Sequence, residues 1–249
     1  MVGSSIVNIL KKKKNIKLIL KNKSEVDLTR QNEVEDFFDL EKPDEVYIAA
    51  AKVGGIKYNA AYPAEFIYQN LMIQTNIIQS AKNAKVKKLL FLGSSCIYPK
   101  FANQPMQEKD LLTGQLEPTN EAYAVAKIAG IKMCESYNFQ YGTNYKCLMP
   151  TNTFGPNDNY DSLNSHFFPS LIKKIHIIKK KNKNTLTLWG DGSPKRELIF
   201  VDDLAEACVF FMNKKIKEAL INIGTGKDFT IKQYAKLLLK IIYPGKKIK

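Results

Sequence analysis

Short apolar runs and longer amphipathic segments alternate along most of this chain, and this alternation is what most constrains its fold. Runs typical of β-strands cover residues 16–20, 45–51, 88–92, 145–149 and 221–223. Helical patterns cover residues 3–13, 31–40, 63–83, 121–141 and 202–213. Strands that alternate with helices usually form a parallel sheet with helices packed on both faces. The sequence therefore predicts an α/β fold with a doubly wound parallel sheet.

The alternation weakens after Pro150, where we expect a second, smaller part. We predict a Rossmann-type dinucleotide-binding domain over residues 1–155 and a mainly substrate-binding lobe over residues 156–249, with a strand at 219–224 that returns to the sheet. The chain opens directly on the helical pattern around Gly3, without the strand and glycine-rich turn that begin such a domain. We therefore expect the first strand to be missing and the C-terminal lobe to be truncated.

Composition narrows the classes of protein and of partner. The 249 residues are 45% hydrophobic, enough for one sizeable core, and carry a net charge of +14. The lysines lie mostly at helix ends and in loops without interleaved aromatics, which favours a solvated surface or a pocket for a phosphorylated small molecule over nucleic acid. No run reaches the ~20 apolar residues of a membrane span, and the first residues lack the charged and apolar regions of a signal peptide, so we expect no membrane partner and a cytoplasmic location. The four cysteines form no Cys-x-x-Cys pair, which predicts reduced thiols and no metal site.

Two neighbouring motifs carry groups that can move a proton at a ketone. Gly93 to Pro99 (Gly-Ser-Ser-Cys-Ile-Tyr-Pro) follows the buried strand at 88–92, so Ser94 should lie at the edge where open α/β sheets bind ligands. Tyr123 and Lys127 share one face of a helix, where the ammonium should favour phenolate and lower the pKa of the tyrosine. Each motif alone is commonly structural, a chance helical spacing or a turn, but their combination favours catalysis on a carbonyl.

Several further motifs extend this pattern along nearly the whole chain: Ala49 to Ile56, Leu116 to Glu121, Met149 to Asn152, Asn164 to His166, Trp189-Gly190 and Val201 to Asp203. Together with the two motifs above, they resemble the GDP-L-fucose synthase family of the extended short-chain dehydrogenase/reductase superfamily. The Ser-Ser-Cys, Pro-Thr-Asn and Asn-Ser-His elements separate this family from the wider epimerases. The resemblance implies NADPH-dependent 3,5-epimerisation and 4-reduction of GDP-4-keto-6-deoxy-D-mannose, and a homodimer.

The resemblance also implies catalytic roles for five residues. Tyr123 would donate a proton to the 4-keto oxygen, with Lys127 tuning it and Ser94 bonding the same oxygen. Cys96 and His166 would be the acid/base pair that inverts C3 and C5. Such a pair is chemically reasonable, since a carbon beside a ketone needs one group to remove its proton and another to return it, and a thiol and an imidazole are both expected to titrate near neutral pH. Outside these motifs, a cysteine at a strand end is usually a small buried hydrophobe and a lone histidine a structural residue.

For the cofactor, the resemblance implies NADP(H), with Gly3 as the third glycine of the phosphate-binding turn. Lys21 and Lys23 would meet the 2′-phosphate, although solvated surface lysines are nearly as good an interpretation. The remaining residues expected to line the cofactor site are Asp27, Leu28, Ala50, Leu92, Gly93, Ser94, Ser95, Lys127, Pro150, Thr151, Asn152, Thr153 and His166.

For the nucleotide sugar, the resemblance points to Lys174, Trp189 and Arg196, because an apolar face and two cations suit a guanine ring and a pyrophosphate. Trp189 could equally lie in the core. Two rival hypotheses remain, namely a related nucleotide-sugar epimerase or reductase and an inactive truncated fragment. Cys96 together with His166 favours the epimerising enzyme, because a simple reductase needs neither.

Overall fold

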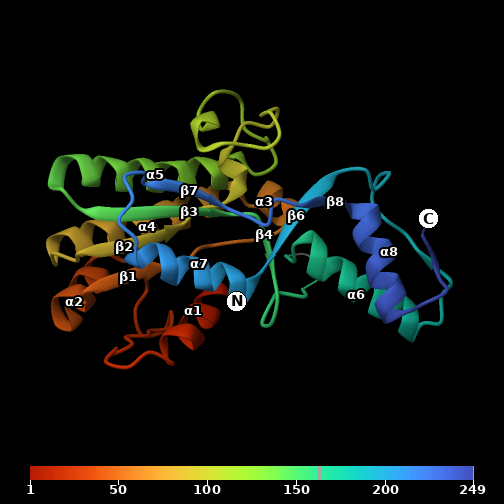
Figure 1. Cartoon of the computed structure of the whole chain (residues 1–249), viewed down its shortest axis with the longest axis horizontal. Helices are drawn as coiled ribbons and strands as arrows, with labels where there is room; N and C mark the ends of the chain where they lie inside the picture. The colour runs from red at the N-terminus through yellow and green to blue at the C-terminus, as the bar shows by residue number, and fades with distance from the viewer. Residues whose placement is uncertain (162–163, 249) are drawn as a thin grey trace.

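The computed structural model describes residues 1–161 and 164–248 (Figure 1). Its largest sheet contains β1 (Glu45–Ile48), β2 (Lys88–Leu92), β3 (Asn144–Pro150) and β7 (Leu220–Ile223) in the order β1-β2-β3-β7. All three pairings are parallel, with Phe91 opposite Cys147 and Met149 opposite Asn222. The predicted α/β fold with a parallel sheet is therefore confirmed.

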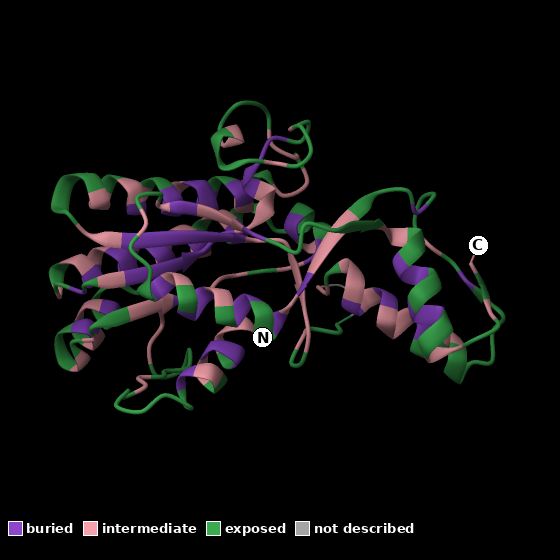
Figure 2. Cartoon of the chain, in the orientation of Figure 1, coloured by how far each residue is buried: buried purple, intermediate pink, exposed green. Residues whose placement is uncertain are grey.

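Helices cover both faces of this sheet because its strands are apolar on both sides. Leu89 and Phe91 of β2 pack into a cluster with α2 (Gln31–Glu41), α4 (Pro63–Asn83) and α5 (Glu121–Tyr141). Leu90 and Leu92 point the other way, toward α1 (Val2–Leu10) and α7 (Val201–Asn213). This two-residue alternation along one strand produces a core on each face (Figure 2).

Two of the predicted strands differ in the structure. The segment 16–20 is irregular, and its prediction as a strand was wrong. An apolar run becomes a strand only where a neighbour completes its hydrogen bonds, and β1 pairs only with β2 among the described residues. The run at 45–51 ends as a strand at Ile48, and residues 49–55 form a loop that leads into α3 (Ile56–Ala61).

A smaller lobe lies beyond one end of the sheet (Figure 1). It contains α6 (Phe167–Lys180), α8 (Ile231–Ile242) and the short pair β5 (Thr185–Leu186) and β9 (Lys247–Ile248). Its core contains a group of rings around Tyr234, which contacts Phe167, Phe168 and Phe229. The lobe therefore has apolar packing of its own.

Three short strands connect the lobe to the main sheet. β4 (Asn152–Phe154) follows β3 almost directly and pairs in parallel with β6 (Lys195–Phe200). β6 also pairs antiparallel with β8 (Asp228–Thr230), which follows β7 by a few residues. The chain thus crosses between sheet and lobe several times.

The segment between β2 and α5 forms an irregular excursion with two 3₁₀ turns, Ser95–Ile97 and Glu108–Asp110. It is attached to the edge strand β7, where Asn222 accepts a hydrogen bond from Tyr98 Oη at 2.5 Å and donates one to Met106 O. Within the described part of the chain, no helix is both long and apolar enough to cross a membrane.

Candidate active site

The carboxyl ends of the four parallel strands lie at one edge of the sheet and position the candidate site. Beyond the ends of β2 and β3, Gly93 N–H donates to Leu148 O at 2.9 Å and Thr151 N–H to Ile223 O at 3.0 Å. A Cβ at Gly93 would lie 2.0 Å from Met149 Cε, so a larger residue here would displace the end of the Met149 side chain. The segments 93–95 and 151–153 therefore leave the sheet side by side.

Ser94, Cys96, Tyr123 and Lys127 come together at this edge. The Ser94 hydroxyl lies close enough to the Tyr123 phenol and to the Cys96 thiol to lower the pKa of each. Lys127 is buried, and its ammonium donates to Leu92 O at 2.8 Å and lies 5.8 Å from the centre of the Tyr123 ring. The helical spacing of Tyr123 and Lys127 in α5 thus brings both side chains to the residues that follow β2.

The pKa of Tyr123 differs from the expectation. Burial and, to a smaller extent, the neighbouring Cys96 raise the pKa of the Tyr123 phenol. Ser94 lowers this pKa, but its effect is too small to offset burial. The ammonium of Lys127 does not offset this effect, and burial lowers its own pKa to about 8, which still leaves it mostly charged at neutral pH. The predicted lowering of the tyrosine pKa was therefore wrong, and at neutral pH Tyr123 holds its proton.

Cys96 is likewise protonated at neutral pH, since burial raises the pKa of its thiol to about 11 despite opposing effects of Ser94 and Lys127. The side chain is nevertheless partly exposed, whereas Cys134, Cys147 and Cys208 are buried. The expectation that this thiol titrates near neutral pH was wrong, because burial disfavours the thiolate.

His166 lies at the N-cap of α6, where its carbonyl accepts the Ser170 N–H at 3.1 Å. Burial lowers the pKa of its imidazole, and the Asp158 carboxylate opposes this change. Among the described residues, no hydrogen bond joins the side chain of His166 to Cys96. The imidazole is uncharged at neutral pH.

A glycine turn connects the segment before His166 to the tyrosine. Gly55 N–H donates to Asn164 O at 3.0 Å, and a Cβ at Gly55 would lie 2.6 Å from Ser165 O. Gly54 packs against Phe66, whose ring meets that of Tyr123 edge to face at 6.1 Å. The turn at Gly54 and Gly55 therefore contacts both the segment that leads into His166 and, through Phe66, the ring of Tyr123. Spacing alone did not single out Phe66 or the structural task of this turn.

Several residues expected to hold the cofactor lie where β1 and β3 end, at the same edge of the sheet. Gly3, at the start of α1, lies beside Ala49, since a Cβ added to Gly3 would lie 3.4 Å from the Cβ of Ala49. The next residue, Ala50, is exposed. The hydroxyl of Thr151 is buried and has no hydrogen-bond partner among the described residues, so a polar ligand group could satisfy it. Pro150, Asn152 and Thr153 are partly buried beside it.

The residues expected around the 2′-phosphate lie in the irregular segment before α2. Lys21 and Lys23 are both exposed, and Lys21 forms an ion pair with Glu25 at 3.6 Å. Asp27 accepts hydrogen bonds from the backbone and hydroxyl of Thr29, which lower the pKa of its carboxyl. Leu28 O accepts from Asn76 Nδ2 at 3.0 Å, which attaches this segment to α4.

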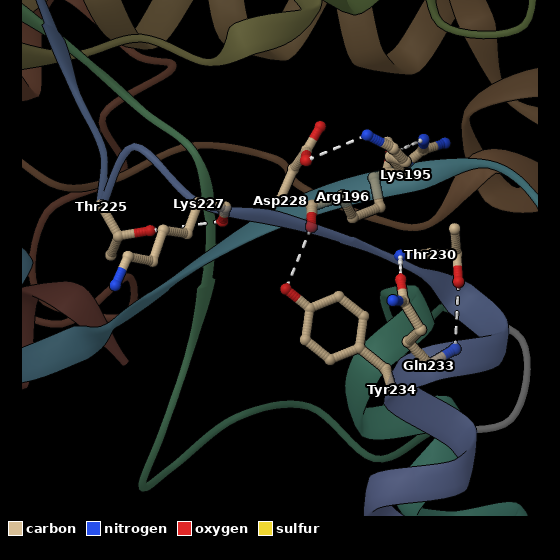
Figure 3. A network of polar contacts seen from close by, with 8 residues as sticks. All are labelled: Lys195, Arg196, Thr225, Lys227, Asp228, Thr230, Gln233 and Tyr234. Atoms are coloured by element: carbon tan, nitrogen blue, oxygen red, sulfur yellow. Dashed lines mark hydrogen bonds and ion pairs between the residues drawn. The ribbon is translucent and has the colours of Figure 1, made fainter.

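The residues expected to bind the nucleotide lie in the lobe. Trp189 is 68% exposed, so its alternative placement in the core was wrong, and Lys174 Nζ lies 4.7 Å from its ring centre. Arg196 lies in β6, where Tyr234 Oη donates to its carbonyl at 3.0 Å and fixes its backbone (Figure 3). Lys57 of α3, which sequence reasoning missed, also lies over the Trp189 ring, at 4.2 Å. The described residues contain no cluster of three or more His, Cys, Asp or Glu side chains that could bind a metal ion.

Iodoacetamide should alkylate Cys96 first, because it is the only partly exposed cysteine of the four. Its raised pKa of about 11 means that the thiolate fraction, and with it the rate, should rise about tenfold per pH unit between pH 7 and 10. Peptide mass spectrometry over time measures this rate, with Cys96→Ser as the unreactive control. A rate that levels off below pH 9 would contradict the raised pKa.

Comparisons with known proteins identify the family. Residues 1–224 match the NAD dependent epimerase/dehydratase family. The chain is 53% identical to GDP-L-fucose synthase 1 of Arabidopsis thaliana, covering 99% of this chain and 76% of that one, and 50% identical to GDP-L-fucose synthase of Escherichia coli K12, covering 99% and 80%. A GDP-D-glycero-L-gluco-heptose synthase from Campylobacter jejuni, solved in the presence of NADPH, superposes with a TM-score of 0.90 at 36% identity, covering 99% of this chain and 84% of that one. The chain therefore belongs to the NAD dependent epimerase/dehydratase family and, within it, to the GDP-L-fucose synthases.

Proposed function

We propose that this chain converts GDP-4-keto-6-deoxy-D-mannose to GDP-L-fucose by 3,5-epimerisation followed by NADPH-dependent 4-reduction. The observation that carries the proposal is the meeting of Ser94, Cys96, Tyr123 and Lys127 at the carboxyl edge of the sheet. A reductase needs Ser94, Tyr123 and Lys127, but the thiol has a task only where a carbon must exchange its proton. The 50–53% identity to GDP-L-fucose synthases supports the same reaction.

In the reduction, bound NADPH supplies the hydrogen and two electrons that C4 of the sugar receives. Tyr123 donates its phenolic proton to O4, a role that suits a phenol whose raised pKa keeps it protonated at neutral pH. Ser94, which lies beside that phenol, orients the same oxygen. Lys127 holds a positive charge behind the tyrosine and stabilises the phenolate left after transfer.

In the epimerisation, the 4-keto group makes the protons on C3 and C5 acidic. One of Cys96 and His166 removes such a proton, and the other returns one to the opposite face of the carbon. Both groups are uncharged at neutral pH, because burial raises the pKa of the thiol and lowers that of the imidazole. In this uncharged pair the imidazole can accept a proton and the thiol can donate one. Cys96 can act as the base only after it has lost its own proton, and that ionisation is the costly step.

We propose that the cofactor lies along the edge formed by Gly3, Ala50, Gly93 and Thr151, with its pyrophosphate at the N-terminus of α1. The unpartnered Thr151 hydroxyl supports this placement. Lys21 and Lys23 would contact the 2′-phosphate, because both are exposed in the segment before α2. Leu92, Ser95, Asp27, Leu28 and residues 150–153 would complete the groove.

We further propose a cytoplasmic homodimer with no nucleic-acid or membrane partner. Helices α4 and α5 pack on each other and expose apolar side chains to solvent, among them Tyr68, Val125 and Phe139, which is 95% exposed. Exposed apolar groups of this kind are typical of protein interfaces. We also keep residues 1–155 and 156–249 as the proposed cofactor and substrate parts.

The proposal is tested by incubating the purified chain with GDP-4-keto-6-deoxy-D-mannose and NADPH. We expect one NADPH to be oxidised for each molecule of nucleotide sugar consumed, and NMR should identify the product as GDP-L-fucose. A 4-reduced product that keeps the starting configuration at C3 and C5 would favour a reductase without epimerase activity. No consumption of NADPH would overturn the proposed reaction.

A further inference from the structure

Two lysines from different parts of the fold meet at one exposed ring. Lys57 belongs to α3, which follows the loop after β1, whereas Lys174 and Trp189 belong to the lobe. Lys57 Nζ lies 4.2 Å and Lys174 Nζ 4.7 Å from the centre of the Trp189 ring. The ring itself is 68% exposed. The three side chains therefore form a cationic and aromatic cluster at the boundary between sheet and lobe.

The two positive charges of this cluster are not neutralised. Neither lysine forms an ion pair within 4 Å in the described part of the chain. An aromatic face attracts a cation but does not cancel its charge. Burial and the charge of Lys57 lower the pKa of Lys174, as expected for two ammonium groups that repel each other. An anion bound beside both ammonium groups would relieve this repulsion.

The backbone that carries Lys57 is fixed. The Gly55 N–H donates to Asn164 O at 3.0 Å, and the buried Asn59 side chain donates to Gly54 O at 2.7 Å and to Gly55 O at 3.2 Å. Because Asn164 immediately precedes the Ser165-His166 pair, these bonds hold α3 against the segment of the candidate catalytic histidine. The backbone just before Lys57 is therefore tied to the segment that leads into His166.

We propose that Lys57 is a further substrate-binding residue, which binds the diphosphate of the nucleoside-diphosphate sugar together with Lys174, beside the apolar face of Trp189. The inference rests on the proposed function for the identity of the nucleotide. A diphosphate carries at least two negative charges on adjacent phosphates, which matches two ammonium groups brought from opposite parts of the fold. Bound in this way, the ligand links the sheet to the lobe.

The test is the affinity of Lys57→Met for GDP by isothermal titration calorimetry. We expect the dissociation constant for GDP to rise about tenfold or more, because a charged hydrogen bond is lost. Binding of guanosine, which lacks phosphate, should not change. Lys57→Arg should stay close to wild type, and in turnover KM for the nucleotide sugar should rise more for Lys57→Met than kcat falls.

Lys236→Met is the matched control, since Lys236 is an exposed lysine in the middle of α8, and its affinity for GDP should equal that of wild type. Lys57 is also exposed, so both variants should melt at the wild-type temperature. Equal GDP affinity of Lys57→Met and wild type overturns the inference. If wild-type protein binds UDP and pyrophosphate but not GDP, and Lys57→Met weakens that binding, the diphosphate site is supported and the proposed guanine nucleotide is overturned. If the wild-type protein binds none of the three ligands, both proposals are overturned.

Discussion

Replacement of Tyr123 by phenylalanine should lower kcat for the 4-reduction by about 10²–10⁴-fold, because the carbonyl oxygen loses its proton donor. The substitution removes one oxygen atom and keeps the edge-to-face contact between this ring and Phe66. Affinity for the nucleotide sugar should therefore stay near that of wild type, and the loss should appear in kcat rather than KM. Absorbance at 340 nm during NADPH oxidation measures the rate.

Tyr141→Phe provides the matched control for this prediction. Tyr141 ends the same helix, α5, but its side chain is exposed at 46%, far from the residues that follow β2. Its kcat should equal that of wild type. A Tyr123→Phe enzyme that retains more than a third of the wild-type turnover would remove the phenol from the mechanism and leave Ser94 and Lys127 as the groups that act on the oxygen.

The parallel sheet could be predicted from the sequence because its strands are apolar on both faces and lie between long helical patterns. The strand β2 and the helices α4 and α5 have the expected bounds. Segment 16–20 shows the limit of this reasoning, since an apolar run carries no information on whether a partner strand lies beside it. β4 and β8, with three residues each, were missed because their strand form depends on pairing with β6 from a distant part of the chain.

The members of the candidate site were easier to predict than its electrostatics. Spacing in α5 brings Tyr123 and Lys127 to one face of a helix, but it does not reveal how deeply they are buried. Burial outweighs the attraction between ammonium and phenolate, so the pKa of the tyrosine rises instead of falling. Lys57 was missed for a similar reason, since only the tertiary structure brings α3 and the lobe to the same ring.

Replacement of Cys96 by serine should separate the two halves of the reaction. We expect deuterium uptake from solvent at C3 and C5 to fall by about 10²–10⁴-fold, because a serine hydroxyl is a much weaker acid than a thiol and the proton-transfer group is lost. Hydride transfer to a ketone should change far less, since Tyr123 and Lys127 remain in place. Mass spectrometry of the nucleotide sugar after incubation in D₂O measures the uptake, with NADP⁺ to prevent turnover.

Cys208→Ala is the control for this substitution, because Cys208 is buried in α7 on the opposite face of the sheet. Its deuterium uptake should match that of wild type at a temperature where both variants are folded. Ser94 contacts both the thiol and the phenol, so a small fall in the reduction rate of Cys96→Ser is compatible with an altered hydrogen bond. Wild-type deuterium uptake by Cys96→Ser, however, would make Cys96 a structural residue, and the chain would then be better explained as a reductase that leaves C3 and C5 unchanged.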